Sequence, residues 1–196
     1  MRVAVFVDAG YVFAQGSKLL SDSGNKIARG NLEIDAKKIV ARLTNFAATK
    51  SSNKELLRIY WYDGAPISGT LPAQDQFAEM DNVKLRLGQL NSANQQKGVD
   101  SLIVIDLTEL ARNNAISDAV VFAGDEDIRI AVQLAQSHGV RVHLLGIRGV
   151  AKNDNQSPSL QKESDTVSIW HKSEVASFLK QVAEPKAPPE KKTQAK

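Results

Sequence analysis

The sequence predicts an α/β three-layer sandwich, in which helices cover both faces of a central, mostly parallel sheet. Strand-like and helix-like segments alternate along most of the 196 residues, as they do in chains that form parallel sheets. The apolar runs 3–7 and 119–123 have the length and composition of buried strands. The second run is followed by a helix pattern over 128–137 and a strand pattern over 140–146, which indicates a right-handed crossover.

Cap and turn residues delimit the elements of the first half of the chain. Asp35 fits the N-cap of a helix over 36–48, because apolar residues recur there at helical spacing. A proline in the first turn favours a short helix over 72–80. The other elements expected in this half are a helix end and long loop over 17–28 and strands over 56–62 and 83–90.

The second half contains one ambiguous segment. From Asp100 onward the apolar residues follow a helical stripe, but the β-branched content of 102–105 would also suit a strand; we favour a helix. The polar residues 91–97 are expected to be exposed, and 148–164 to be a loop. A strand over 166–170 and a helix over 174–182 capped by Ser173 complete the prediction.

Composition predicts one folded domain over 1–183 and a disordered, Pro- and Lys-rich tail over 184–196. Four lysines and two glutamates of the tail supply two of the three net positive charges, so charge alone does not establish nucleic acid binding. The absence of cysteine excludes disulfides and thiolate chemistry. No apolar stretch has the length of a membrane span, and we expect no membrane association and a cytoplasmic location.

Four aspartates are candidates for one metal site. Asp8 and Asp125 follow the two buried strands, where open α/β sheets place their ligands. Asp127 lies two residues after Asp125, and Asp100 ends the segment Lys97-Gly98-Val99-Asp100. Carboxylate oxygens suit Mg²⁺ or Mn²⁺, which can activate water for phosphodiester hydrolysis. Each residue also has a structural alternative: a turn for Asp8, a favourable helix-start charge for Asp100 and an N-cap for Asp127. Asp106 is not expected to be a metal ligand.

Other chemistries find less support in the sequence. The histidines 138, 143 and 171 lack the spacing of a zinc site. An aspartyl-phosphate enzyme would need a second aspartate where this chain has Gly10. Neither a P-loop nor a dinucleotide-binding glycine motif follows a predicted strand, which argues against ATP, GTP or NAD.

Several separate motifs, in a fixed order, make the chain similar to the NYN domain family, in particular to its bacterial LabA-like members. The resemblance covers approximately residues 1–171. It rests on Val5-Phe6-Val7-Asp8, Tyr60-Trp61-Tyr62-Asp63-Gly64, Gln96-Lys97-Gly98-Val99-Asp100, Ile105-Asp106-Leu107, Val120-Val121-Phe122-Ala123-Gly124-Asp125-Glu126-Asp127, Gly139-Val140-Arg141-Val142, Ser159-Leu160 and Asp165.

The resemblance implies a PIN-like, Rossmann-like topology with an acidic site that binds Mg²⁺ or Mn²⁺ and cleaves RNA. By position Asp8, Asp100, Asp125 and Asp127 match that site, the last as a ligand or as the activator of the attacking water. The family analogy also allows a homodimer. The chain departs from the family where polar residues are common: Tyr11 and Ala123 stand in place of Asn and Ser, and Ile128 replaces Phe.

Four further residues are candidates for binding RNA. Arg148 and Lys152 would border the site and hold phosphates, Lys97 would contact a phosphate and Tyr11 would stack on a base. For each of them a solvated loop position or simple packing is the competing interpretation. The sequence therefore predicts a metal-dependent ribonuclease. The alternative is a catalytically weak or inactive NYN module that regulates by binding RNA or protein, and a small-molecule phosphohydrolase is a third class.

Overall fold

The computed structural model describes residues 1–65, 69–90, 96–150 and 155–182. Its centre is a seven-stranded sheet with the order β5-β4-β3-β1-β6-β7-β8. All neighbouring pairs are parallel except β4 and β5, which confirms the predicted sheet. The strands are β1 (Arg2–Asp8), β3 (Glu55–Ala65), β4 (Val83–Leu90), β5 (Gln96–Lys97), β6 (Asp118–Phe122), β7 (Arg141–Ile147) and β8 (Thr166–Trp170).

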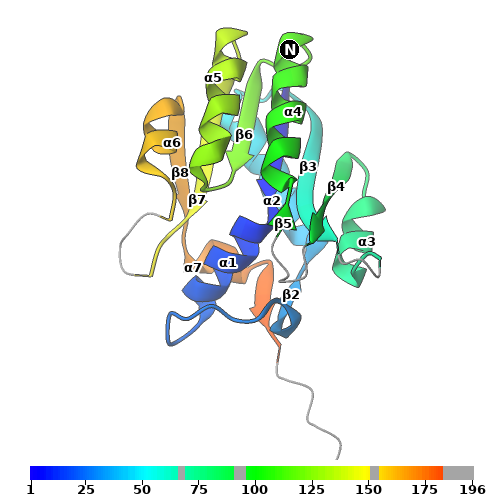
Figure 1. Ribbon diagram of the computed structural model, residues 1–196, viewed down its shortest axis with the longest axis vertical. Helices are drawn as coiled ribbons and strands as arrows, with labels where there is room; N and C mark the ends of the chain where they lie inside the picture. The colour runs from blue at the N-terminus through cyan, green and yellow to red at the C-terminus, as the bar shows by residue number, and fades with distance from the viewer. Residues whose placement is uncertain (66–68, 91–95, 151–154, 183–196) are drawn as a thin grey trace, which may run out of the picture.

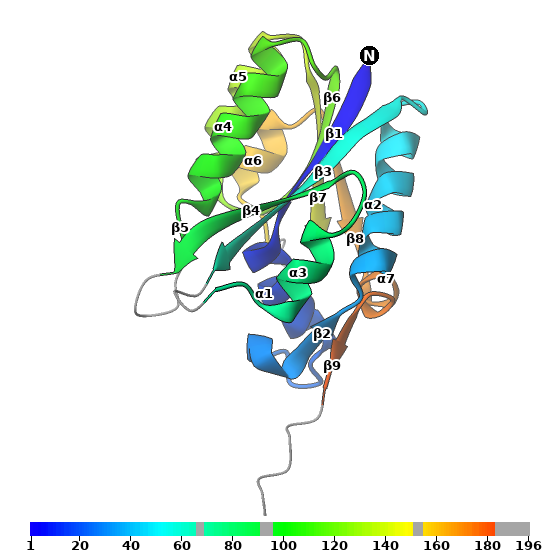
Figure 2. The same cartoon turned by 90° about the vertical axis from the view of Figure 1, so that its right-hand side faces the viewer.

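Helices cover both faces of this sheet, and each layer encloses a separate hydrophobic core (Figure 2). Ile103 and Leu107 anchor one layer against the sheet, and Ile39 and Leu43 anchor the other. The first layer contains α4 (Val99–Arg112), α5 (Arg129–Ser137) and α6 (Pro158–Glu163); the second contains α1 (Ala9–Leu20), α2 (Ala36–Lys50), α3 (Pro72–Ala78) and α7 (Lys172–Ala176). The chain is therefore the predicted three-layer α/β sandwich.

The prediction of a helix over 174–182 is wrong. The helix here is α7, which begins after His171 rather than at Ser173 and ends at Ala176. The chain then forms β9 (Leu179–Gln181), antiparallel to β2 (Leu32–Ile34). The pairing with β2 gives the backbone of this segment hydrogen-bond partners, and Leu179 remains buried.

Other short elements also differ from the prediction. The segment 148–164, expected as a loop, contains α6, and Gln96–Lys97 form β5 at the end of a stretch expected only to be exposed. The favoured helix after Asp100 is confirmed as α4. The tail 184–196 lies outside the described residues.

The parallel arrangement brings the carboxyl ends of the central strands to one edge of the sheet. In Figure 1 this edge lies at the lower ends of β1 and β6, beneath the starts of α4 and α5, and the N-terminus lies at the opposite edge. Any residue that follows β1 or β6 is therefore placed at a common edge. None of the helices in the described part of the chain has both the length and the apolar character of a membrane span.

Candidate metal centre

Asp8 is the last residue of β1 and the N-cap of α1. Its carboxylate accepts a hydrogen bond from the backbone nitrogen of Tyr11 at 3.2 Å, so its structural role is that of a helix cap rather than the turn considered as its alternative. The residue is only 6% exposed, at the point where β1 passes directly into α1. Asp8 is therefore a buried carboxylate at the carboxyl edge of the sheet.

Asp125 reaches the same edge from the neighbouring strand. β1 and β6 are in parallel register up to Val7 and Phe122, and Asp125 follows three residues after Phe122. It precedes the 3-10 helix η2 (Glu126–Ile128), and its side chain makes no capping hydrogen bond there, unlike that of Asp8. The carboxylate is exposed and is not occupied by a local structural role.

Asp100 arrives from a different direction. Gly98, at φ 82°, takes the left-handed conformation that turns the chain from β5 into α4, and Asp100 lies in the first turn of that helix. The helix-start position proposed as its structural alternative is thus correct. The same position directs the partly buried carboxylate toward the sheet edge.

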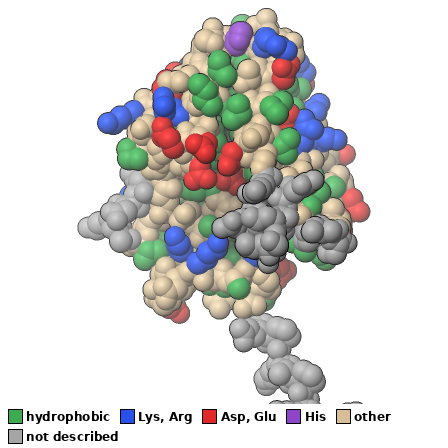
Figure 3. All heavy atoms as spheres, viewed as in Figure 1, with side chains coloured by type: hydrophobic (Ala, Val, Ile, Leu, Met, Phe, Trp, Pro, Cys, Tyr) green, Lys and Arg blue, Asp and Glu red, His purple; other side chains and the backbone are tan. Residues whose placement is uncertain are grey.

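The three carboxylates converge. Asp8, Asp100 and Asp125 each offer one oxygen, and these atoms all lie within 4.8 Å of one another. Figure 3 shows acidic side chains gathered at the middle of this face, at the lower ends of α4 and α5. We call Asp8, Asp100 and Asp125 the acidic triad. Its oxygen donors and their spacing fit a hard divalent cation that keeps part of its water shell.

The carboxylates of the acidic triad are destabilised in their charged forms by burial and by one another. Burial raises the pKa of Asp8 to about 7, and the negative charges of Asp100 and Asp125 add to the effect against the hydrogen bond from Tyr11. Burial, followed by the charges of Asp125 and Asp127, also raises the pKa of Asp100. A bound cation would relieve both effects, because it compensates the buried charge.

The other buried aspartates already have cationic partners. Asp63 pairs with Arg29, Asp106 with Arg86, and Asp118 with Lys54. Within the described part of the chain, Asp8 has no ion pair with Lys, Arg or His. Buried charges in proteins are paired or coordinate metals, so Asp8 stands out from the other three. The ion pair of Asp106 agrees with its expected exclusion from the metal ligands.

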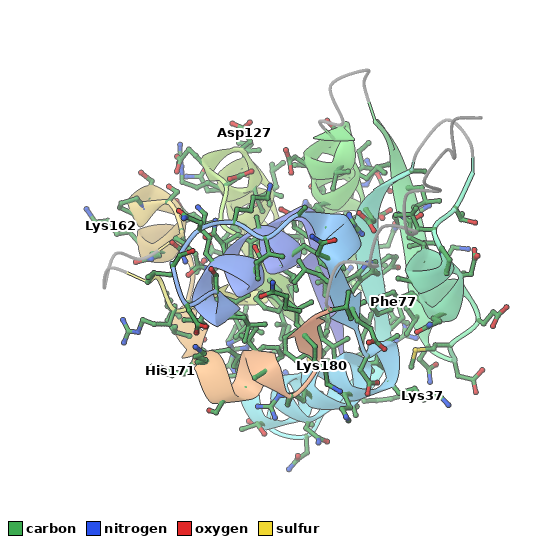
Figure 4. The ribbon with its side chains drawn as sticks, turned by 90° about the horizontal axis from the view of Figure 1, so that it is seen from below. Lys37, Phe77, Asp127, Lys162, His171 and Lys180 are labelled. Atoms are coloured by element: carbon green, nitrogen blue, oxygen red, sulfur yellow. The ribbon has the colours of Figure 1, made fainter. Side chains whose placement is uncertain are left out.

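Asp127 lies beside the acidic triad and is not a member of it. It occupies the middle of η2, where the N-cap of η2 is Asp125 and that of α5 is Ile128, so the N-cap alternative for Asp127 is not realised. Its charge contributes to the raised pKa of Asp100, which places it close to the site. Figure 4 shows Asp127 at the rim of the molecule on this side.

Residues that the sequence analysis did not select hold the Asp125 segment in place. Glu126 accepts hydrogen bonds from Ser157 and, at 2.6 Å, from Nε of Arg129. The buried amide of Gln156 donates to the carbonyls of Ala123 at 2.7 Å and Leu145 at 3.0 Å, across the ends of β6 and β7. These contacts come from a segment expected to be a loop, and only its Pro158 and capping Ser157 signalled α6.

Tyr11 packs in the core rather than facing the site. Its ring is 7% exposed and makes an edge contact with Phe122, and its hydroxyl accepts a hydrogen bond from the backbone of Ile147 at 3.1 Å. A Cβ added to Gly124 would lie 2.5 Å from the ring. The ring therefore has no open face for a base, and we correct the stacking role suggested for it in favour of the packing alternative.

The remaining RNA-binding candidates are only partly described. Lys152 lies outside the described residues, as does the side chain of Lys97. Arg148 follows β7 and lines a cavity of about 610 Å³ together with Lys172 and Asp22. Arg29, a basic residue of the first long loop, is committed to its ion pair with Asp63.

The three-layer α/β sandwich with an acidic cluster at the carboxyl edge of its sheet is consistent with a PIN-like fold. The chain belongs to the NYN domain family, whose model matches residues 2–171. The predicted membership of the NYN family is therefore confirmed, while the likeness to its LabA-like members stays a prediction.

A relative from Sinorhizobium fredii (strain NBRC 101917 / NGR234), described as "Uncharacterized protein y4oD", is 58% identical over 106 residues. That match spans 54% of this chain and 49% of the relative, about half of each protein. No solved structure matches the chain.

Proposed function

We propose that this protein is a metal-dependent ribonuclease that hydrolyses RNA phosphodiester bonds at the acidic triad. The observation that carries the proposal is the buried Asp8 carboxylate, which has no cationic partner among the described residues and meets Asp100 and Asp125 within 4.8 Å. Such an arrangement stores like-charge repulsion unless a cation binds. Membership of the NYN family supplies the expectation of RNA as the substrate.

The chain's own residues have distinct tasks in this proposal. Asp8, Asp100 and Asp125 hold Mg²⁺ or Mn²⁺, which would polarise the scissile phosphate and lower the pKa of a bound water. Asp8 is fixed by its hydrogen bond to Tyr11, and Asp125 by the contacts that anchor η2. In this proposal the exposed Asp127 orients the attacking water or accepts its proton. Arg148 remains a candidate for holding a neighbouring phosphate.

The test is metal-dependent cleavage of a labelled single-stranded RNA by the purified protein. We expect cleavage with Mn²⁺ or Mg²⁺ and none in EDTA. Asp8→Asn and Asp125→Asn should each lower the rate by more than the roughly 10- to 100-fold that loss of a residue supporting a metal ligand costs. Asp75→Asn, which removes an exposed carboxylate in the first turn of α3, is the matched control and should cleave like the wild type.

Two outcomes would replace the proposal. RNA binding without cleavage above the level of the Asn variants would favour a regulatory NYN module. Phosphate release from mononucleotides, with intact RNA, would favour a small-molecule phosphohydrolase.

A further inference from the structure

At the β3 and β4 end of the sheet, part of the face that packs against α4 is exposed and carries cationic side chains. Along the parallel pair of β3 and β4, Tyr60 lies beside Lys84 and Tyr62 beside Arg86. Alternate residues of neighbouring strands point to the same face, and Tyr60 and Tyr62 belong to the core beneath α4. Lys84 and Arg86 therefore extend this face beyond the cover that α4 provides.

Three cations occupy the open area. Lys84 and Arg58 are exposed, and the guanidinium of Arg58 lies 5.6 Å from the centre of the Tyr60 ring. Neither residue forms an ion pair within the described part of the chain. We call Arg58, Lys84 and Arg86 the basic strip. In Figure 3, Lys and Arg side chains gather on the right of this face, over β3 and β4.

Arg86 is held in a fixed position within the basic strip. Its Nε and Nη2 donate to the two oxygens of Asp106 at 2.9 and 2.5 Å, and the hydroxyl of Tyr62 donates to the same carboxylate at 2.9 Å. The side chain of Arg86 is still 39% exposed. Asp106 balances one of the three cations of the basic strip and leaves the other two without a fixed counter-charge.

Arg86 is the member of the basic strip nearest the acidic triad. Lys84 and Arg58 continue the strip toward the opposite edge of the sheet, in the rows of Phe6 and Ala4. Asp8 is in register with Tyr62, and Tyr62 is in register with Arg86, so their Cα atoms share one row across three strands. Two interstrand spacings separate Asp8 from Arg86, on the order of 10 Å. Both sites also lie on the α4 side of the sheet, because Asp8 alternates with Phe6 of the core beneath α4.

We propose that the basic strip binds the phosphate backbone of the RNA strand that the acidic triad cleaves, on one side of the scissile bond. This inference rests on the proposed function. The triad alone carries negative charge and repels RNA, so an adjoining cationic surface is needed for productive encounter. The recognition is by charge: the Tyr60 ring, packed parallel to those of Phe6 and Tyr62, is 5% exposed and offers no face to a base. The strip therefore binds RNA without sequence preference.

The test measures RNA affinity separately from cleavage. Fluorescence anisotropy of a labelled, mixed-sequence single-stranded RNA is recorded in EDTA at several salt concentrations. The double variant Arg58→Glu, Lys84→Glu reverses the two unpaired cations. The matched control is the double variant Lys37→Glu, Lys180→Glu, which makes the same change in charge at exposed positions outside the basic strip. Both residues are labelled in Figure 4 and line one cavity. Circular dichroism and thermal melting verify that each variant is folded.

We expect the strip variant to bind RNA at least tenfold more weakly than the wild type. In a plot of the logarithm of the association constant against the logarithm of the salt concentration, the slope of the variant should be less steep by about 1.4. This change corresponds to two lost phosphate contacts on a single strand. The control variant should stay within twofold of the wild type. The inference is overturned if the strip variant binds within twofold of the wild type, if both double variants lose affinity equally, or if the wild type does not bind RNA.

The two proposals fail in different ways. If the wild type cleaves RNA with Mn²⁺ and the strip variant binds RNA normally, RNA binding by the basic strip is disproved and the proposed ribonuclease activity stands. If the strip variant loses affinity and the wild type does not cleave, the binding surface stands and the ribonuclease is wrong.

Discussion

The backbone nitrogen of Tyr11 donates a hydrogen bond to Oδ1 of Asp8 over 3.2 Å, so the carboxylate that caps α1 also belongs to the acidic triad. An N-cap needs only an oxygen acceptor, whereas a metal ligand in this position benefits from full negative charge. Asparagine supplies the oxygen acceptor but lacks the negative charge. Substitution of Asp8 therefore separates the structural task of this residue from the functional one.

Asp8→Asn should stabilise the metal-free protein at pH 8. Folding raises the pKa of Asp8 from 3.8 to about 7, so the wild type loses stability as the pH rises between these values and the loss is complete above pH 7. The variant avoids this loss. At about 1.4 kcal/mol per pKa unit we expect a gain of about 2–4 kcal/mol in the free energy of unfolding, measured by urea denaturation in EDTA.

Two comparisons check that interpretation. The gain should disappear below about pH 4, where Asp8 is protonated in both states. Asp35 is the N-cap of α2, and the pKa of its carboxyl is lowered, mainly by the hydrogen bond from the backbone nitrogen of Lys38. Asp35→Asn should therefore bring no gain in the free energy of unfolding. An Asp8→Asn protein less stable than the wild type at pH 8 would show that burial of this charge is not costly.

The affinity for Mn²⁺ should depend on pH. Below the raised pKa of Asp8, a proton must leave when the cation binds, because the two compete for the same carboxylate. We expect the association constant to rise by up to about tenfold per pH unit well below pH 7, less steeply as the pH approaches 7, and to level off above it. Isothermal titration calorimetry in buffers of different ionisation enthalpy would also detect the released proton. A constant affinity from pH 5.5 to 8 would contradict the account.

Gly124→Ala should weaken metal binding from a position that is not a ligand. The added Cβ would lie 2.5 Å from the Tyr11 ring and 2.7 Å from the carbonyl oxygen of Asn155, so the backbone must move just before Asp125. We expect a loss of about 1–3 kcal/mol in stability and a weaker affinity for Mn²⁺. Gly30→Ala is the control, because its Cβ would meet nothing within 4 Å. Equal Mn²⁺ affinity in both variants would show that this packing does not position Asp125.

Arg29→Met should destabilise the fold. Both Nη atoms of Arg29 donate to the fully buried carboxylate of Asp63, which also accepts from Gln74 at 2.9 Å. Removing the cation takes away the ion pair of a buried carboxylate, and we expect a cost of about 3–5 kcal/mol. Thermal melting measures the effect. Lys37→Met, a substitution of an exposed cation, should be close to neutral. A neutral Arg29→Met would mean that Asp63 does not depend on this pair.

The sequence was most informative where local pattern and topology agree. The runs ending near Asp8 and Asp125 are continuous apolar strands, and parallel pairing places their ends together, so these two members of the acidic triad followed from periodicity. Asp100 depended on the family motif, because only the left-handed Gly98 and the start of α4 bring it to the sheet edge. The ambiguous segment 102–105 became helix because Ile103 and Leu107 form a stripe that packs on the sheet.

Long-range pairings escaped the sequence analysis. β9 exists because Leu179 pairs with Ile34, far earlier in the chain, and its own residues fit a helical stripe equally well. The burial of Tyr11 depends on contacts with Phe122 and Ile147, which no local pattern reveals. The partners of Asp63 and Asp106 are likewise distant in sequence, so no local pattern revealed these two ion pairs.

The most direct test of the acidic triad is a Mn²⁺ titration of the wild-type protein and of Asp125→Asn at pH 8, monitored by calorimetry. Asp125 is exposed, so its substitution should leave the fold intact while it removes a ligand. We predict saturable binding of one or two ions to the wild type and a loss of at least tenfold in affinity for the variant. No binding to the wild type at millimolar Mn²⁺, or equal affinity in the two proteins, would contradict the metal centre.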